Sequence, residues 1–360
     1  MRPKLSPNWL LVFVPVSVLL EHAEGVSPAL VFFAAALAII PAARLIVQGT
    51  EHIAVRTGPA VGGLLNATFG NLPELIIAGV ALRAGLLDLV RASIIGAILA
   101  NLLLALGVSM LVGGVRYHNQ EYNPGAARIY SSMMLLAVIM LAGPGAFERV
   151  FSGAEHLPQV HAINARLAIM LIGVYALYLV FMLGTHREEF AGKAGADHHD
   201  HQQGSEWGVP RALGTLVGAS VLAAWMSEIL VGAAEGTGEA LGMSQTFIGI
   251  IIVAIVGGAA ESLSAIAAAA KNKLDLTMGV VYGSCVQIAL FVAPALVLLS
   301  RVIAPAPLDL SFKRVELGVL FFAVLIGAVV ANDGKGNWFK GAQLLAVYGM
   351  IALLLYFVPA

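Results

Sequence analysis

The sequence predicts an all-α polytopic membrane protein of about eleven transmembrane helices: one extra N-terminal helix and two inverted five-helix repeats, with broken helices at the midplane. Three observations predict this fold. The 360 residues are 59% hydrophobic and 11% charged, whereas soluble domains are about 45–50% apolar and about 25% charged. Apolar stretches close to the roughly 20 residues that span a bilayer recur along the chain. A motif containing a glutamate lies inside two of these stretches, at Glu74 and Glu261.

The composition excludes several classes of function. The 20 basic and 21 acidic residues give a formal net charge of −1. Because the basic residues are scattered singly, a nucleic-acid partner is not expected. The single cysteine, Cys285, excludes an intrachain disulfide and a thiol redox pair. Neither HExxH nor GxSxG occurs, so an intramembrane hydrolase is only a distant alternative, and no bound cofactor is expected.

The eleven spans follow one another with short polar connections. We place them near residues 9–20, 28–47, 58–82, 89–113, 129–146, 166–184, 211–234, 243–270, 276–299, 315–331 and 341–358. The first span is short and follows Arg2 and Lys4, which also suits a signal peptide, but the next segment, EHAEGVSP, offers no small-residue cleavage site. We therefore expect an N-terminal anchoring helix.

The distribution of lysine and arginine predicts the orientation. If the N-terminus is cytoplasmic, thirteen basic residues lie inside and seven outside, which agrees with the positive-inside rule. We therefore expect a multi-pass protein of the cell (plasma or inner) membrane with a cytoplasmic N-terminus. Its partners are then the lipid bilayer and its transported ions, and a homo-oligomer is compatible with the sequence.

The longest hydrophilic segment divides the remaining ten spans five and five. We expect an anchoring helix (1–27), a first five-helix repeat (28–184), a cytoplasmic linker rich in histidine and acidic residues (185–209) and a second five-helix repeat (210–360). The linker contains His186, His198, His199 and His201. Low-complexity polarity is the common explanation for such a run, and a regulatory metal site is the alternative.

An internal repeat supports this division. Shifting the chain by 187 residues superimposes GNLPELIIAG, which starts at Gly70, on GGAAESLSAI, which starts at Gly257, and aligns Asp88 with Asp275. Because each copy holds an odd number of spans, the second copy enters the membrane upside down relative to the first. Inverted repeats of this kind place a binding site near the midplane, between the two halves.

Each motif predicts a break within a membrane helix. In the first motif, Gly70 loosens the helix, Asn71 can cap the segment that follows, and Pro73 has no N–H to donate. In the second motif, Gly257 and Gly258 permit the same break through backbone freedom. We expect a half-helix to begin at each break.

Glu74 and Glu261 then lie in the first turn of each half-helix. A structural alternative is a capping box, because Asn71-x-x-Glu74 has the required spacing. An ionisable side chain near the centre of a span costs at least ~2.5 kcal/mol on insertion scales. Capping alone does not explain that cost twice, so we favour a functional pair.

Two converging carboxylates repel each other unless protons or a cation neutralise them. A joint charge of −2 suits a hard divalent cation such as Ca²⁺, which takes six to eight oxygen ligands at roughly 2.3–2.6 Å. Glu74 and Glu261 are therefore the predicted ligands of a transported Ca²⁺. Because protons and the metal compete for the same oxygens, the pair predicts a cation/proton antiporter.

Polar residues in neighbouring spans are candidate helpers. Asn101, Ser284 and Gln287 can ligate the cation or orient the glutamates, although polar contacts between helices are an equal alternative. Glu228 lies inside a span and is a candidate for leading the cation inward. Two further acidic residues near it, Glu235 and Glu239, fit a solvated loop better.

The sequence resembles the calcium/proton exchanger (CAX) family of the calcium/cation antiporter superfamily. The resemblance covers nearly the whole chain and is carried by GNLPE and GGAAES, by SEILVG ahead of TFIGIIIVAIVGGAAES, by YGSCVQIALFVAP and by ANDGKGNWFKGAQLLAVY. It implies exchange of Ca²⁺ for H⁺ by alternating access. It also implies transport roles for the matching residues Glu74, Glu261, Asn71, Asn101, Ser284, Gln287 and Glu228.

Two positions depart from the family pattern, in which the second motif usually reads GNAAEH. Gly258 stands where asparagine is expected, and Ser262 stands where histidine is expected. Losing an amide and an imidazole beside the site affects the expected cation preference or proton coupling. A Na⁺-coupled exchanger, or one that transports a monovalent cation or Mn²⁺, is therefore the alternative within the superfamily.

Overall fold

The computed structural model describes residues 7–57, 59–150, 157–190 and 207–357, and each predicted span falls on a helix. The first half contains the elements η1 (Pro7–Val12), α1 (Phe13–His22), α2 (Pro28–Thr57), α3 (Pro59–Phe69), α4 (Leu72–Arg83), α5 (Leu87–Leu99), η2 (Ala100–Ala105), α6 (Leu106–Tyr117), β1 (Asn119–Glu121), α7 (Pro124–Val150), α8 (Leu157–Val180), η4 (Phe181–Thr185) and α9 (Arg187–Phe190).

The second half follows the same plan. Its elements are α10 (Val209–Leu241), α11 (Gln245–Phe247), η5 (Ile248–Val253), α12 (Ala254–Gly257), α13 (Ala259–Ala269), α14 (Leu274–Gln287), η6 (Ile288–Val292), α15 (Ala293–Ile303), α16 (Arg314–Val330), β2 (Lys335–Asn337) and α17 (Trp338–Tyr356). The segments η2, η4, η5 and η6 are π-helical.

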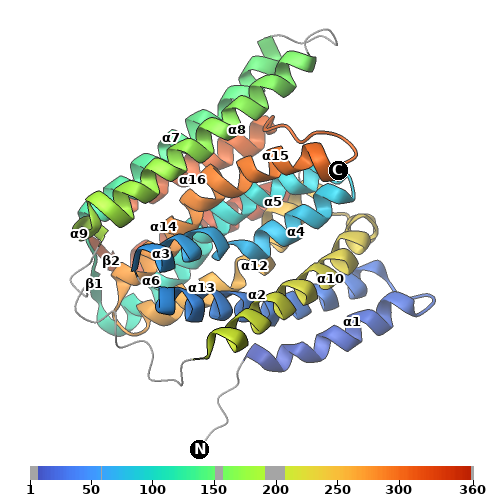
Figure 1. Cartoon of the computed structure of the whole chain (residues 1–360), viewed down its shortest axis with the longest axis horizontal. Helices are drawn as coiled ribbons and strands as arrows, with labels where there is room; N and C mark the ends of the chain where they lie inside the picture. The colour runs from blue at the N-terminus through green and yellow to red at the C-terminus, as the bar shows by residue number, and fades with distance from the viewer. Residues whose placement is uncertain (1–6, 58, 151–156, 191–206, 358–360) are drawn as a thin grey trace, which may run out of the picture.

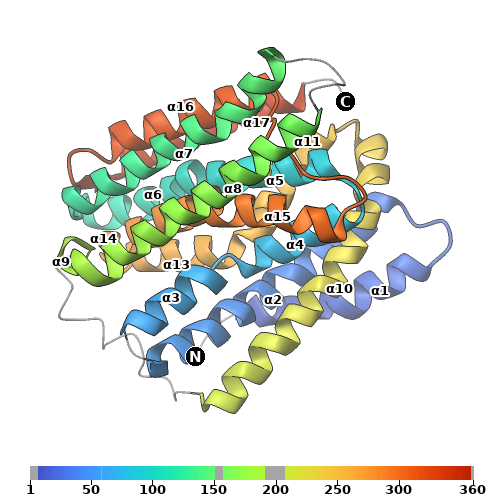
Figure 2. The ribbon, with the colours of Figure 1, turned by 45° about the horizontal axis from the view of Figure 1, so that its top comes forward.

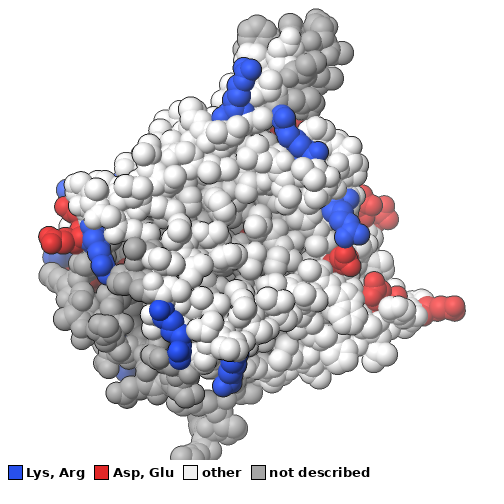
Figure 3. All heavy atoms as spheres, viewed as in Figure 1, with Lys and Arg blue, Asp and Glu red and all other residues white. Residues whose placement is uncertain are grey.

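The predicted all-α membrane fold is confirmed. Among the described residues, eight helices are long and apolar enough to cross a membrane, and a ninth span is a helix pair, Gln245–Gly257 and Ala259–Ala269, bent by 59°. The 17-residue α16 and the apolar helix Asn8–His22 are shorter. Figure 3 shows a broad band without charged residues, with acidic and basic side chains gathered toward the two ends of the molecule.

The helices form a bundle whose outer sides are made by different groups of helices. On one side α2 packs along α10, with α1 beside them, and on the other α7 packs against α8 and α16 (Figures 1 and 2). A small apolar cluster of Ala42, Ile46, Ala219 and Ala223 joins α2 to α10 and is separate from the main core. The helices that carry the repeated motif, α4 and α13, lie between these two sides (Figure 2).

The internal repeat is visible in the helix boundaries. The half-helices α4 and α13 begin 187 residues apart, at Leu72 and Ala259, and so do α5 and α14, at Leu87 and Leu274. The π-helical segments η2 and η6 also end at that spacing. Local geometry as unusual as a π-helical segment is frequent at functional sites, so its recurrence marks equivalent positions in the two halves.

A two-stranded sheet, which the sequence analysis did not predict, joins the halves at one end of the bundle. β1 and β2 pair antiparallel, with Gln120 opposite Gly336. The amide N–H of Asn123 donates to a carboxylate oxygen of Asp275, 2.6 Å away, and holds the start of α14 at the same end. We call this end, which also carries α9, the sheet side (Figure 1).

The opposite end, which we call the far side, is held by ion pairs. Nη2 of Arg91 lies 2.8 Å from a carboxylate oxygen of Asp309, and Nη1 lies 2.8 Å from Asp88. Lys313 also approaches Asp88, at 3.4 Å. These contacts tie the start of α5 in the first half to the segment between α15 and α16 in the second.

Two glycines let α5 cross η5 in backbone contact. A Cβ at Gly96 would lie 2.3 Å from the carbonyl oxygen of Ile250, and a Cβ at Gly249 would lie 2.5 Å from the Cβ of Ala92. Small residues commonly permit such close approaches between membrane helices. This crossing holds the helix after the first glutamate against the segment that leads to the second.

Gly96→Ala should destabilise the protein, because the added methyl group forces α5 and η5 apart. Overpacking of this kind typically costs about 1–3 kcal/mol, so the thermal unfolding midpoint in detergent should fall by several degrees. A matched control is Gly232→Ala on α10, where a Cβ would meet nothing within 4 Å. Equal midpoints for the two variants would contradict the close crossing.

Candidate functional site

The two repeated glutamates lie at adjacent helix breaks in the centre of the bundle. Glu74 is in the first turn of α4 and Glu261 is in the first turn of α13. Their exposed fractions are only 9% and 7%. Oε1 of Glu74 and Oε2 of Glu261 lie 3.7 and 3.9 Å from the point where a Cβ at Gly258 would stand. The predicted convergence of the two carboxylates is therefore present in the structure.

Glycines at the second break make room for this pair. A Cβ at Gly257 would lie 3.1 Å from Cγ of Glu74, and a Cβ at Gly258 would enter the space beside both carboxylates. The first break is similarly close to the second half, since a Cβ at Gly70 would lie 3.5 Å from Oε1 of Gln287. The glycines of the motif therefore give the side chains of the opposite half access to the site.

The carboxylates have no hydrogen-bond partner within the described part of the chain. All four oxygens of Glu74 and Glu261 are buried and lack a hydrogen bond of normal geometry. The hydroxyl of Ser284 lies close to the carboxylate of Glu261. Buried carboxylates without donors are unstable as bare anions, so the arrangement requires protons or a cation.

Other predicted residues supply neutral polar atoms around the breaks. Asn71 is 1% exposed, and both polar atoms of its amide are unpartnered. Its side chain makes no capping hydrogen bond, so the capping-box alternative is not realised, and Pro73 is the second residue of α4. Asn101, in η2, and Gln287, at the end of α14, are buried with unpartnered amide nitrogens.

Glu228 does not join this group. Its side chain is 56% exposed, and Oε1 lies 3.6 Å from Nη1 of Arg83 at the far-side end of α4. It therefore lies outside the carboxylate pair, and its role in leading the cation inward stays a prediction. The linker histidines 198, 199 and 201 lie outside the described residues.

A cavity of about 270 Å³ opens toward the sheet side and reaches one carboxylate. Its wall includes Glu261, Ser284 and Gln287 at the inner end. Residues of α2, α3, α7, α8, η4, α13 and α14 form the rest of the wall. The carboxylate of the second half is therefore accessible from the sheet side.

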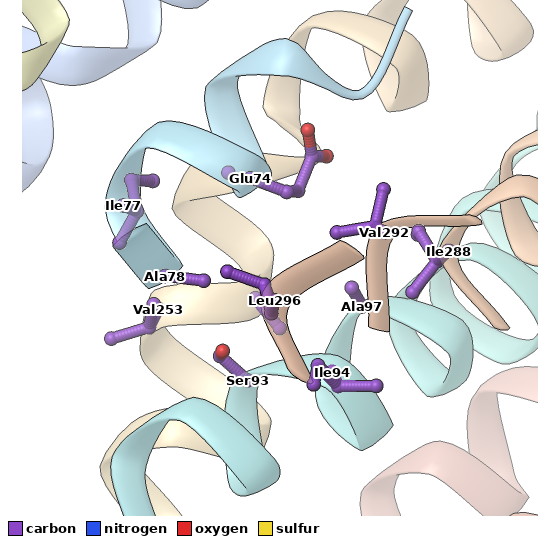
Figure 4. Close-up of a pocket in the computed structure, with 12 residues that line it drawn as sticks. Glu74, Ile77, Ala78, Ser93, Ile94, Ala97, Val253, Ile288, Val292 and Leu296 are labelled. Atoms are coloured by element: carbon purple, nitrogen blue, oxygen red, sulfur yellow. The ribbon is translucent and has the colours of Figure 1, made fainter. Parts of the chain in front are cut away.

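On the far side, the approach to Glu74 is nearly closed. The space there measures only about 20 Å³ and is lined almost entirely by apolar side chains. Figure 4 shows Ile77, Ala78 and Leu296 packed there, with the carboxylate of Glu74 turned away from Ser93 and Ile94. In this structure, the cavity on the sheet side is therefore much larger than the space beside Glu74 on the far side.

Several cavity residues were not predicted from the sequence. Three tyrosines, Tyr130, Tyr175 and Tyr178, line the sheet-side cavity together with Glu51. The hydroxyl of Tyr175 donates to the carbonyl oxygen of Ala67 at 2.7 Å and so fixes the end of α3 before the first break. The i, i+3 spacing of Tyr175 and Tyr178 indicates a shared helix face but not what that face meets.

The donor set fits a hard cation as a transported substrate. Among the described residues, no group of three or more histidine, cysteine, aspartate or glutamate side chains could hold a metal. The two carboxylates supply charge, and the oxygens of Asn71, Ser284 and Gln287 are available neutral donors. Ca²⁺ prefers such all-oxygen ligands.

Comparisons with known proteins agree with this geometry. The sodium/calcium exchanger protein family model matches residues 27–184 and 211–357. The Ca²⁺/H⁺ antiporter of Synechocystis sp. is 41% identical over 362 residues, covering 97% of this chain and 96% of that protein. The Ca²⁺/H⁺ antiporter ChaA of Bacillus subtilis is 40% identical over 344 residues, covering 94% and 95%.

The fold is also found among solved structures. The structure of native YfkE has a TM-score of 0.82 and 36% sequence identity, covering 98% of this chain and 100% of that one. Together with the two antiporters, this match confirms the family resemblance indicated by the motifs.

Ca²⁺ should stabilise the purified protein, because it relieves the repulsion between the carboxylates. A ligand at 100 times its dissociation constant adds about 2.7 kcal/mol. The stabilisation by a fixed Ca²⁺ concentration should increase with pH, since protons occupy the same oxygens at low pH. Thermal unfolding in detergent, with and without Ca²⁺, measures both effects.

Glu74→Gln and Glu261→Gln should fold and should unfold at or above the wild-type temperature without Ca²⁺, because a neutral amide removes the repulsion. Both variants should lose most of the Ca²⁺-dependent stabilisation. Full retention of that stabilisation by either variant would show that the replaced carboxylate is not a ligand.

Proposed function

The chain belongs to the sodium/calcium exchanger protein family, and we propose that it is a secondary active transporter that exchanges Ca²⁺ for H⁺ across a membrane. The single observation that carries the proposal is the convergence of Glu74 and Glu261 at two opposed helix breaks, where both are buried and neither has a hydrogen bond within the described part of the chain. The antiporters at 40% and 41% identity support the exchange of the same two ions, Ca²⁺ and H⁺. The protein is a transporter and not an enzyme.

Exchange follows from competition at one set of oxygens. When Ca²⁺ is bound, the charge on Glu74 and Glu261 is balanced and the pair holds no proton. When Ca²⁺ leaves, the repulsion between the carboxylates favours proton uptake. An empty, fully ionised pair is the least stable form in this low-dielectric position. The protein therefore changes conformation when Ca²⁺ or protons are bound, and not when the pair is empty.

Alternating access follows from the two unequal openings. The sheet-side cavity reaches Glu261, whereas packed apolar side chains cover Glu74 from the far side. In the inverted repeat, the opposite state exchanges these roles and exposes Glu74 to the far side. The ion pairs of Arg91 with Asp88 and Asp309 hold the far side in the present state.

We assign the sheet side to the cytoplasm of a cell membrane. The excess of lysine and arginine on this side supports the assignment, as does the bacterial origin of the Bacillus relative. The N-terminus is then cytoplasmic, and the described part of the linker, around His186 and α9, lies on the same side.

Gly258 is the residue that favours the alternative in which the protein transports a cation other than Ca²⁺. Its backbone angles, φ −80° and ψ 8°, resemble those of Asn71, φ −94° and ψ 29°, at the equivalent position of the first repeat. The backbone at position 258 is therefore compatible with an asparagine, and the second half lacks the side-chain amide that this residue would supply. A site with fewer oxygens discriminates less strongly in favour of Ca²⁺, which prefers a high coordination number, over Mn²⁺.

The proposed exchange is tested in sealed vesicles with an imposed pH gradient. The wild-type protein should take up Ca²⁺ as protons move the opposite way, and Glu74→Gln and Glu261→Gln should each reduce uptake to background, because a fixed neutral amide can neither release a proton nor balance Ca²⁺. Glu239→Gln, exposed near the far-side end of α10, is the charge-matched control and should retain uptake. Unchanged uptake by either site variant refutes its proposed role.

Gly258→Asn should strengthen the preference for Ca²⁺ over Mn²⁺, because it places an amide oxygen beside both carboxylates. The expected change is a severalfold fall in the ratio of the KM for Ca²⁺ to the KM for Mn²⁺, measured by competition in the same vesicles. Gly258→Ala adds the Cβ without the oxygen and should leave the ratio unchanged. Equal effects of the two substitutions would mean that only bulk matters at this position.

A further inference from the structure

The sheet-side cavity contains a second acidic residue that the exchange mechanism does not use. Glu51 lies on α2 and lines the cavity together with Val47, one turn away, and with Glu261 at the inner end. Of the described residues that line the cavity, Glu51 and Glu261 are the only charged ones. The cavity is therefore acidic from its outer part to its inner end.

The carboxylate of Glu51 is available to bind a cation. Within the described part of the chain, it has no ion pair with a basic side chain. Its neighbour His52 stacks on Trp207, with ring centroids 4.7 Å apart, and is engaged there. Glu51 remains accessible to solvent, so a hydrated cation can reach it.

Glu51 also lies well inside its helix. It precedes the last residue of α2, Thr57, by six residues, or about 9 Å at 1.5 Å per residue. Glu51 also lies four residues beyond the span predicted near residues 28–47, in the part of α2 that lines the cavity.

Neutral polar side chains lie in the largely apolar wall of the cavity. Asn66, Ser264, Ser284 and Gln287 line the same cavity. At its inner end, Glu261 is 93% buried and both its carboxylate oxygens lack partners, as does the Nε2 atom of Gln287. This unpartnered buried carboxylate, aimed into the cavity, shows independently of Glu51 that the cavity is built for a positively charged ligand.

We propose that Glu51 forms an outer binding site for a hydrated divalent cation, which Ca²⁺ occupies before it reaches the Glu74 and Glu261 pair from the sheet side. One carboxylate and neutral oxygens hold a cation with most of its water, so the site is weak and exchanges rapidly. An acidic cavity with low-dielectric walls also raises the local cation concentration. The proposal rests on the proposed exchange activity and adds a second cation position to it.

The first experiment changes the charge at position 51 in sealed vesicles. Glu51→Cys should raise the KM for Ca²⁺ presented on the sheet side by roughly three- to tenfold with little change in maximal rate. The native Cys285 is fully buried, so methanethiosulfonate reagents modify only the introduced thiol. A negatively charged sulfonatoethyl group should lower the KM again, and a trimethylammonioethyl group of similar size should raise it further.

The reagents separate charge from bulk. Equal KM shifts with both reagents, or a wild-type KM for unmodified Glu51→Cys, would overturn the proposal while wild-type and Glu239→Gln transport remain intact. If those two proteins do not exchange Ca²⁺ for protons, it is the proposed function that fails.

The second experiment does not depend on transport. In detergent, Glu261→Gln should retain weak binding of radioactive Ca²⁺, and adding Glu51→Gln should remove it. Glu261→Gln combined with Glu239→Gln is the control and should retain it. Identical binding by the single variant and the Glu51→Gln double variant would show that no outer site exists at Glu51.

Discussion

The repulsion between Glu74 and Glu261 is the constraint on which the rest of the structure depends. Two buried carboxylates that lack hydrogen bonds from the described residues cannot both stay ionised without a cation. The surrounding structure keeps this conflict in place. The helix breaks bring both carboxylates beside Gly258, the glycines let the halves approach, and the buried amides of Asn71 and Gln287 carry no charge that would neutralise the pair. Ion exchange is the way in which the molecule relieves this repulsion.

The conformation explains why the carboxylate pair is accessible from one side of the membrane only. The cavity on the sheet side is open as far as Glu261, and the far side is closed by apolar packing around Glu74 and by the ion pairs of Arg91. The β1–β2 sheet and the contact of Asn123 with Asp275 hold the open end. Equivalent positions of the two repeats thus have different surroundings, as alternating access requires.

Much of this arrangement could be predicted from the sequence. Hydropathy placed the spans, because burial in lipid demands long apolar helices, and the spacing of the two motifs predicted the inverted repeat and the pairing of Glu74 with Glu261. The family resemblance was confirmed by the comparisons. These predictions depend on signals that are local or that recur along the chain.

The remaining features depend on contacts between distant segments. Hydropathy placed Glu228 inside an apolar span but did not show that its helix face brings it beside Arg83. Glu51 lies beyond the span predicted near residues 28–47, and only the packing of α2 against α3 shows that it lines the cavity. Asn71 and Glu74 have the spacing of a capping box, but the side-chain amide of Asn71 makes no hydrogen bond with the described residues. Hydropathy and spacing do not determine such helix rotations and side-chain directions.

The most direct test of the central claim is the number of protons released when Ca²⁺ binds to the purified protein, measured by titration calorimetry in buffers of different ionisation enthalpy. The account predicts that binding releases protons at acidic to neutral pH, that the number falls as pH rises, and that Glu74→Gln and Glu261→Gln release fewer or none. Tight Ca²⁺ binding to the wild-type protein without proton release over that whole range would contradict competition for one pair of carboxylates.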